Sequence, residues 1–149
     1  MKTKLILALL AISAVLSSCD PAFTEENVIK NNSGLEVTVI STNINVAIPD
    51  GGEKIVDGDS DMGGANRMSC ERRMRRLLGD SVILQFNDGC ISVVFHKNDT
   101  TGLSPYNFQS SAYTYEDKTA KFPKGDPNSP CYGKLTYTIS ADIIPSDAD

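Results

Sequence analysis

The sequence predicts an all-β fold, a two-layer antiparallel sandwich with one short helix. Segments that alternate apolar and polar residues, rich in β-branched and aromatic side chains, recur along the chain. Clusters of Gly, Pro, Asn and Asp separate these segments about every ten residues. One segment instead has apolar residues at helical spacing. An immunoglobulin-like arrangement and a small barrel are alternatives, because alternation alone does not distinguish them from other sandwiches.

The first predicted strands lie between residues 28 and 48. Residues 28–30 and 35–40 flank the turn-forming residues 31–34, which predicts a hairpin. Residues 44–48 alternate again, and the Pro and paired Gly of residues 49–52 end that strand.

The strongest strand signal is a hairpin over residues 81–96. Two β-rich arms, residues 81–86 and 90–96, flank Asn87-Asp88-Gly89. Each arm places three large apolar side chains on one face: Val82, Leu84 and Phe86, then Ile91, Val93 and Phe95. We expect this hairpin to be the central ribbon of the fold.

Residues 70–78 are predicted to be the helix. Cys70, Met74, Leu77 and Leu78 follow helical spacing and give no strand alternation. The end signals agree, with a capping residue, an acid in the first turn, two bases in the last turn and a glycine after it: Ser69, Glu71, Arg75, Arg76 and Gly79. Further strands are expected at residues 112–115 and 133–140, with a surface loop over 118–130.

The first residues indicate export. Lys2 and Lys4 precede an apolar segment, residues 5–16, that is shorter than the roughly 20 residues of a membrane-spanning helix. Leu16-Ser17-Ser18-Cys19 follows and resembles the lipobox of bacterial lipoproteins. The resemblance implies that residues 1–18 are a signal peptide, that Cys19 carries acyl chains, and that the chain is held on a membrane. A plain secretory signal is the alternative.

Residues 19–26 are predicted to be the lipidated cysteine and a flexible tether, followed by a β-sandwich domain over residues 27–149. Asp20 resembles an inner-membrane retention signal of enteric lipoproteins, whereas acidic residues behind the cysteine resemble an outer-surface signal in gut anaerobes. We favour the outer membrane.

A broader resemblance lies in the turns and strands of the mature chain. The order of residues 31–34, 79–82, 86–89 and 135–139 is similar to small lipoproteins of uncharacterised function from Gram-negative gut anaerobes. Turn and strand motifs of this kind imply a fold, and the resemblance implies no catalytic residue.

The net charge argues against nucleic acid as a partner. The chain has 14 Lys and Arg against 19 Asp and Glu, a net charge of −5; loss of Lys2 and Lys4 with the signal peptide would leave 12 against 19, or −7. A surface of that sign repels phosphate backbones and acidic headgroups.

Two charged clusters are candidate binding sites. All the arginines lie between residues 67 and 76, where they form either an anion or partner site or the solvated face of the helix: Arg67, Arg72, Arg73, Arg75 and Arg76. Asp57, Asp59 and Asp61 have the alternate spacing of Ca²⁺ ligands and resemble the start of an EF-hand loop. Met62 and Met68 replace the Gly and Glu that such a loop needs, so a solvated acidic turn is the preferred interpretation.

With Cys19 lipidated, three cysteines remain and three pairings are possible. We favour a Cys90–Cys131 disulfide, which leaves Cys70 as a buried thiol on the helix. His96, the single histidine, is expected at a half-buried strand end. The tyrosines could form an exposed binding face or pack the strands.

No hydrolase, phosphate-binding or zinc-protease motif occurs, and no cofactor is expected apart from possible Ca²⁺. The leading hypothesis is therefore a non-enzymatic lipoprotein whose β-domain binds a protein, glycan or other cell-envelope component. The alternatives are an inhibitor of a basic hydrolase such as lysozyme, steered by the acidic charge, and a hydrolase or Ca²⁺-dependent glycan binder that uses Asp57–Asp61.

Overall fold

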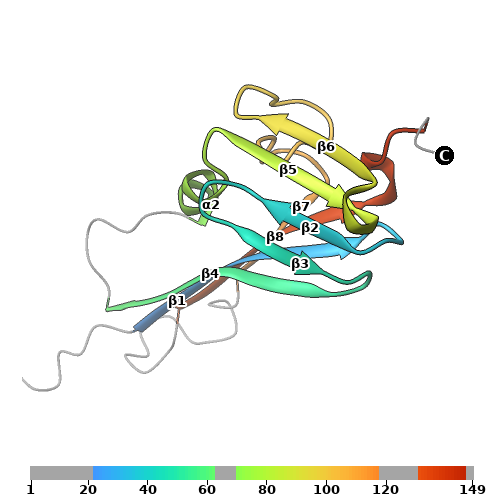
Figure 1. Ribbon diagram of the computed structural model, residues 1–149. Helices are drawn as coiled ribbons and strands as arrows, with labels where there is room; N and C mark the ends of the chain where they lie inside the picture. The colour runs from blue at the N-terminus through green and yellow to red at the C-terminus, as the bar shows by residue number, and fades with distance from the viewer. Residues whose placement is uncertain (1–21, 63–69, 118–130, 147–149) are drawn as a thin grey trace, which may run out of the picture.

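The computed structural model describes residues 22–62, 70–117 and 131–146. These residues contain eight strands, one α-helix and two short 3₁₀ helices (Figure 1). In chain order they are β1 (Ala22–Asn32), β2 (Val37–Ile40), β3 (Asn45–Ile48), β4 (Glu53–Met62), α2 (Cys70–Leu78), β5 (Ser81–Phe86), η1 (Asn87–Gly89), β6 (Ile91–His96), β7 (Tyr113–Asp117), β8 (Cys131–Ser140) and η3 (Ala141–Ile143).

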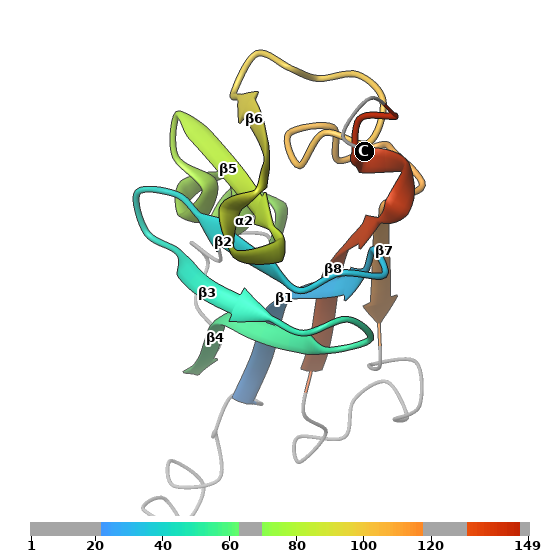
Figure 2. The same cartoon turned by 45° about the vertical axis from the view of Figure 1, so that its right-hand side comes forward.

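The strands form a two-layer sandwich, as the sequence predicts. Sheet A has the order β4-β1-β8-β7 and sheet B the order β3-β2-β5-β6. Figure 2 shows the two sheets as separate layers, and the described strands do not close into a barrel. β1 and β8 pair in parallel, whereas every other pair is antiparallel. This pairing joins segments about a hundred residues apart and has no local sequence signal.

The predicted hairpin over residues 28–40 is wrong, because β1 belongs to sheet A and β2 to sheet B. The turn-forming residues 31–34 instead make a corner that carries the chain between sheets. Asn31 is fully buried there, and its Nδ2 donates to the carbonyl oxygens of Leu35, at 2.7 Å, and Ile48, at 2.9 Å. Turn residues suit a corner and a hairpin equally well, so the local sequence could not separate them.

Two further expectations are corrected along sheet A. Residues 22–26, assigned to the tether, form the start of β1 and pair with both β4 and β8. Residues 57–61, expected to be an acidic turn or open loop, lie within β4. Tertiary pairing with β1 overrides the weak strand propensity of Asp and Gly in this segment. Residues 1–21, 63–69, 118–130 and 147–149 lie outside the described part, including the predicted signal peptide, Ser69 cap and surface loop.

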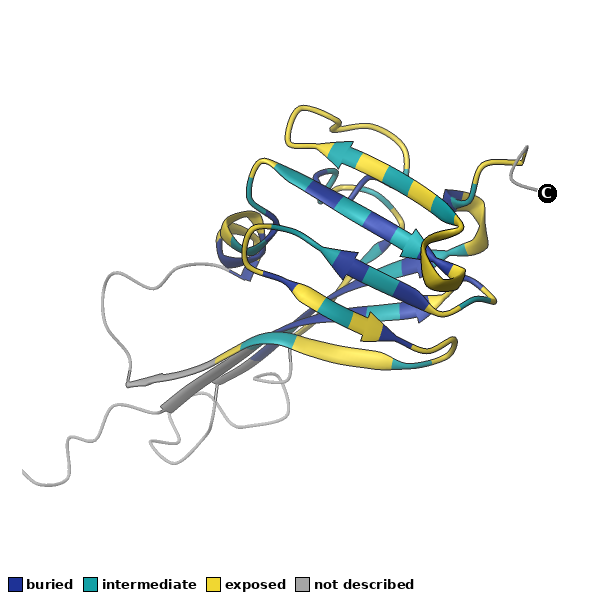
Figure 3. Cartoon of the chain, viewed as in Figure 1, coloured by how far each residue is buried: buried dark blue, intermediate teal, exposed yellow. Residues whose placement is uncertain are grey.

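The predicted hairpin over residues 81–96 is confirmed as β5 and β6. Its connection places Asn87 and Asp88 at positive φ, which Asn and Asp tolerate better than most residues. Val82, Leu84 and Phe86 are buried, while the inward side chains of β6 are half-buried (Figure 3). The hairpin is not the central ribbon, because β6 is the edge strand of sheet B.

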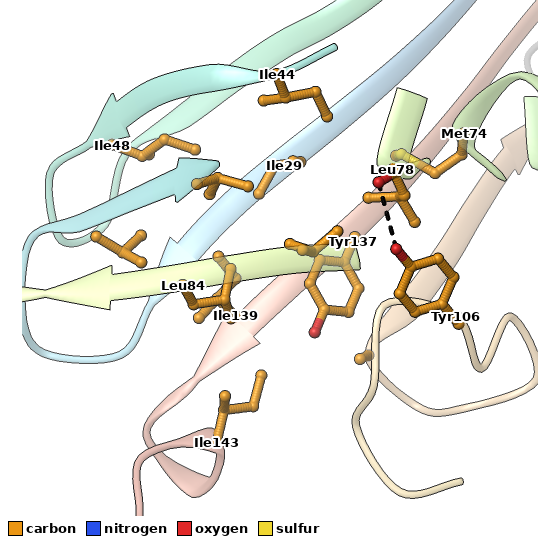
Figure 4. Close-up of a cluster of buried hydrophobic side chains, with 14 of the residues drawn as sticks. Ile29, Ile44, Ile48, Met74, Leu78, Leu84, Tyr106, Tyr137, Ile139 and Ile143 are labelled. Carbon is orange, nitrogen blue, oxygen red and sulfur yellow. Dashed lines mark hydrogen bonds between the residues drawn. The ribbon is translucent and has the colours of Figure 1, made fainter. Parts of the chain in front are cut away.

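The core fills the space between the sheets and continues under the helix (Figure 4). Ile29, Tyr137 and Ile139 of sheet A face Val39 and Leu84 of sheet B. Helix α2 packs against β1, β4 and β8 through Cys70, Met74 and Leu78, which are buried as predicted. The helix therefore covers the part of sheet A that extends past sheet B.

Candidate functional site

The structure separates Arg73 from the other described arginines of the cluster. Arg73 is buried and faces sheet A, whereas Arg72, Arg75 and Arg76 are exposed on the other side of α2. Arg75 pairs with Glu71 one helical turn away, with Nη2 2.9 Å from Oε1. Arg67 lies outside the described residues. Arg72, Arg75 and Arg76 share the outward side of the helix, as both the anion-site and the solvated-face predictions require, and Arg73 has a separate role.

Arg73 binds Asp57, so the structure joins one member of each predicted charged cluster. Its Nε donates to Asp57 Oδ2 at 2.8 Å, and the two side chains are only 9% and 22% exposed. This hydrogen bond to the guanidinium holds the pKa of Asp57 below its usual value of 3.8, with smaller contributions from the Asn27 amide and the charge of Arg76 opposed by burial. The ion pair fastens the helix to β4.

Neither the preferred acidic turn nor the alternative Ca²⁺ loop at Asp57, Asp59 and Asp61 is present, because the segment is a strand. These residues occupy successive alternate positions of β4 and pair with Asn27, Glu25 and Phe23 of β1. An EF-hand loop must fold around the ion, which an extended strand in a sheet does not do. The side chains of Asp59 and Asp61 lie outside the described part, and the described residues contain no group of metal-ligating side chains.

Asn27 is a buried polar side chain in the same region, and its amide lies near enough to Asp57 to lower the pKa of that carboxyl. It is 1% exposed, and neither its Nδ2 nor its Oδ1 has a partner within hydrogen-bonding geometry. It pairs in register with Asp57 on one side and Leu135 on the other. Sequence reasoning missed Asn27 because an Asn before an apolar pair resembles an ordinary strand end.

Phe108, Tyr113 and Tyr137 pack against one another, and Arg75 packs on Phe108. Arg75 lies 4.3 Å above the Phe108 ring, Phe108 stacks on Tyr113 at 4.7 Å, and Tyr113 contacts Tyr137 at 5.0 Å. Tyr113 and Tyr137 donate their hydroxyls to the carbonyls of Pro105 and Leu103, at 2.6 and 2.7 Å. These bonds fix residues 103–108 against sheet A, which supports the packing alternative for these tyrosines.

Tyr106 extends the same role to the helix. Its hydroxyl donates to the carbonyls of Leu78, at 3.3 Å, and Gly79, at 3.2 Å, where the helix ends (Figure 4). Burial, with smaller effects from Asp80 and Asp99, raises the pKa of Tyr106 to about 12. Tyr115 is 56% exposed on β7.

The favoured Cys90–Cys131 disulfide is wrong, because Cys90 is an exposed free thiol. Cys90 follows β5, whose last residue pairs with Val37 beside the corner. Cys131 is the first residue of β8 and pairs with Phe23 near the start of β1, whereas the corner follows the other end of β1. At the rise of a ten-residue strand, Cys131 and Cys90 therefore lie roughly 30 Å apart. His96 lies at an exposed strand end, where its backbone N–H donates to Asp99.

A shallow groove of about 200 Å³ lies between β3 and β4, the edge strands of the two sheets. Residues 43–46 and 54–56 line it, and Lys54 is its only charged residue. None of the residues predicted from the sequence as site residues lies in this groove.

The structure gathers exposed carboxylates that are far apart in the sequence at one end of the sandwich. We call this the acidic end; its carboxylates are Glu36, Asp50, Asp88 and Asp142. Gly34 N–H donates to Asp50 at 2.9 Å, and Asn87 N–H donates to the Glu36 carbonyl at 3.1 Å, so the connections adjoin. Residues 33–36, 49–52, 87–90 and 141–146 contain no Lys or Arg. Each carboxylate lies in or beside a turn, and only the sheet order shows that the turns meet.

Comparison with known proteins gives no relative: no protein-family model, curated protein or solved structure matches the chain significantly. Within the described residues, no helix has the length and apolar content to cross a membrane.

Proposed function

We propose that this protein is a lipoprotein, anchored through acyl chains on Cys19, whose β-sandwich binds a protein, glycan or other component of the cell envelope without catalysis. The observation that carries the proposal is Leu16-Ser17-Ser18-Cys19 behind a short apolar segment and two lysines. Two or three acyl chains suffice for stable membrane attachment. The outer membrane is the favoured location.

The start of β1 constrains how such an anchor would hold the domain. β1 begins at Ala22, three residues after Cys19, so the anchored strand would start within about 10 Å of the bilayer. The long strands of sheet A would then rise from the membrane, with the acidic end on the side away from it (Figure 1). A partner in solution would meet the acidic end first.

Binding without catalysis is the function best supported by how the candidate residues are used. Arg73 is engaged with Asp57, and three tyrosine hydroxyls are bonded to backbone carbonyls. Side chains that hold the fold together in this way are poor candidates for acid–base or nucleophilic work.

Membrane fractionation of cells that express the full chain tests the anchor. The wild-type chain is expected in the membrane fraction, and Cys19→Ser is expected to leave it. Cys90→Ser is the matched control, because it removes an exposed thiol that has no proposed anchoring role. Equal membrane association of wild type and Cys19→Ser would refute the proposal.

The acidic end supports a second candidate, an inhibitor of a basic hydrolase such as lysozyme. Carboxylates gathered at one end of an acidic protein attract a cationic enzyme and steer its association. Inhibition is expected to weaken with added salt and with Asp88→Asn. Asp80→Asn is the control because it removes the same charge at the opposite end of β5. Undiminished lysozyme activity at excess protein would exclude this candidate.

A further inference from the structure

The outward side of α2 carries an excess of positive charge in an acidic chain. The helix contains four arginines and a single acid, Glu71. Arg73 binds Asp57 on sheet A. The other three arginines are exposed at positions about one helical turn apart, where α2 is coloured as exposed in Figure 3: Arg72, Arg75 and Arg76. The chain as a whole has a net charge of −5, so this excess is local.

Two acids lie near the end of the helix and are bound on the side of β6. Asp80 binds the Lys97 side chain at 2.6 Å and accepts the Lys97 N–H through its carbonyl. Asp99 accepts the backbone N–H of His96 at 2.6 Å. Both acids therefore face the connection after β6. On the outward side of α2 itself, three bases outnumber the single acid, Glu71.

The helix lies over the half of sheet A from which β1 starts (Figure 1). Asp57, the partner of Arg73, pairs in register with Asn27 of β1. At the rise of a strand, α2 is therefore roughly 17 Å along β1 from Ala22. The three residues from Cys19 to Ala22 span at most about 10 Å. The basic side of α2 is thus near the predicted anchor, and the acidic end is at the other end of the strands.

We propose that the outward side of α2 binds the anionic phospholipid headgroups of the membrane that holds Cys19, so that the domain leans onto the bilayer. The inference rests on the proposed function, because the anchor brings α2 to the membrane. Arginine binds phosphate oxygens through forked hydrogen bonds, and bases close to an anionic surface are attracted to it. The net charge of the whole chain opposes this contact, so it requires both the anchor and an orientation that presents α2.

The dimensions of the fold allow this orientation. A helix with its side chains is about 10–12 Å across, so the outward arginines lie roughly 15 Å from the plane of sheet A. They reach the same surface as Cys19 when β1 is inclined by about 30–40° to the membrane. The acidic end then stays at least about 15 Å from the headgroups, which exceeds the screening length of about 10 Å. The orientation therefore brings the bases to the membrane and keeps these acids away from it.

Chemical modification of the arginines on vesicles tests the proposal. The chain purified from membranes is reconstituted into vesicles of phosphatidylcholine, alone or mixed with phosphatidylglycerol, and treated with phenylglyoxal. Mass spectrometry of peptides then gives the modification rate of each arginine. At low salt, Arg72 and Arg76 are expected to react about fivefold more slowly on the anionic vesicles, and high salt should abolish the difference. Alkylation of Cys90, an exposed thiol at the acidic end, should be equal on both vesicles.

Two double variants locate the contact. Arg72→Gln/Arg76→Gln is expected to remove the protection of Arg75 by anionic vesicles. Lys30→Gln/Lys54→Gln is the matched control, because it removes the same charge from sheet A nearer the acidic end, and it should keep the protection. Slow modification of the buried Arg73 in both variants would show that each is folded.

The outcomes separate this inference from the proposed anchor. Flotation with the neutral vesicles depends on the anchor alone, so a chain that does not float refutes the proposed function and this inference with it. A chain that floats but reacts equally on both vesicles refutes only the leaning. Protection by inorganic phosphate on neutral vesicles would indicate a site for free anions, and protection only in whole cell envelopes would indicate a protein partner. Either result, or equal loss of protection in the lysine variant, would overturn the inference.

Discussion

Two asparagines of β1 show how differently one residue type is used. Asn27 and Asn31 are both buried, at 1% and 0% exposure. The Asn31 side chain makes four hydrogen bonds: it donates to the Leu35 and Ile48 carbonyls and accepts from the backbone N–H and hydroxyl of Ser33. Asn27 makes none. A buried polar group stabilises a fold only when it is hydrogen-bonded. Loss of the Asn31 side chain should therefore lower the free energy of unfolding much more than loss of the Asn27 side chain.

Alanine substitution separates the two. Asn31→Ala is expected to lower the free energy of unfolding by about 3 kcal/mol, because it leaves buried groups of the corner unpaired. Asn27→Ala creates a similar cavity but loses only the weak interaction of its amide with Asp57, and it is expected to cost about 1 kcal/mol or less. Urea unfolding measures both values. Equal costs would show that the bonds of Asn31 do not hold the corner.

The Arg73–Asp57 pair gives a second test at this scale. Arg73→Met is expected to cost about 2 kcal/mol, because it leaves a partly buried carboxylate without its partner. Lys97→Met is the control and should leave the free energy of unfolding nearly unchanged, since Lys97 and Asp80 are 59% and 85% exposed.

The pH dependence of this pair has a defined sign. The pKa of Asp57 is lowered in the folded state, so its contribution to stability is complete above pH 3.8 and is lost as the pH falls through the lowered value. The stability gap between wild type and Arg73→Met should therefore narrow in acid. If the difference in the free energy of unfolding between wild type and Arg73→Met instead widens in acid, a group other than Asp57 provides the stabilisation.

Tyr106 is one of the buried tyrosines whose ionisation lowers stability in alkali. Its pKa rises from 10.0 to about 12 in the folded state, so the folded protein holds a proton that the unfolded chain releases. Stability is expected to fall as the pH rises from 10 to 12. Tyr106→Phe should show a shallower fall in melting temperature over this range. An identical slope in wild type and Tyr106→Phe would contradict the effect of burial on this hydroxyl.

At the scale of elements, Gly79 fixes where α2 ends. Gly79 has φ +66°, its N–H donates to the Arg75 carbonyl, and a Cβ there would lie 2.8 Å from Thr42 Oγ1. Gly79→Ala is expected to cost about 2 kcal/mol through backbone strain and crowding. Gly102→Ala, at φ +56° with open space around it, should cost about 1 kcal/mol. Urea unfolding measures the free energy of unfolding of both variants. Equal losses would show that crowding against Thr42 does not contribute.

The elements that the sequence predicts correctly are those with local signals. Alternation and the Asn87–Gly89 turn define β5 and β6, and helical spacing with Gly79 defines α2. β4 has no such signal, because Asp57, Gly58 and Asp59 disfavour strands and only pairing with β1 holds them extended. The corner at Asn31 and the parallel β1–β8 pair depend on contacts across the sandwich, which no local window contains.

At the scale of the molecule, the arrangement of the sheets decides what each charged residue does. The sequence places Arg73 in one cluster and Asp57 in another, whereas the packing of α2 on β4 makes them partners. The acidic end likewise arises from sheet order. Spacing along the chain identifies residue types, and only the topology shows which of them meet.

The central claim is the lipid on Cys19, and the mass of the protein extracted from membranes tests it most directly. Intact mass spectrometry should show a chain that begins at Cys19 and carries a diacylglyceryl group, with or without a further acyl chain. An unacylated chain, whether it begins at Met1 or at a residue other than Cys19, would contradict the account.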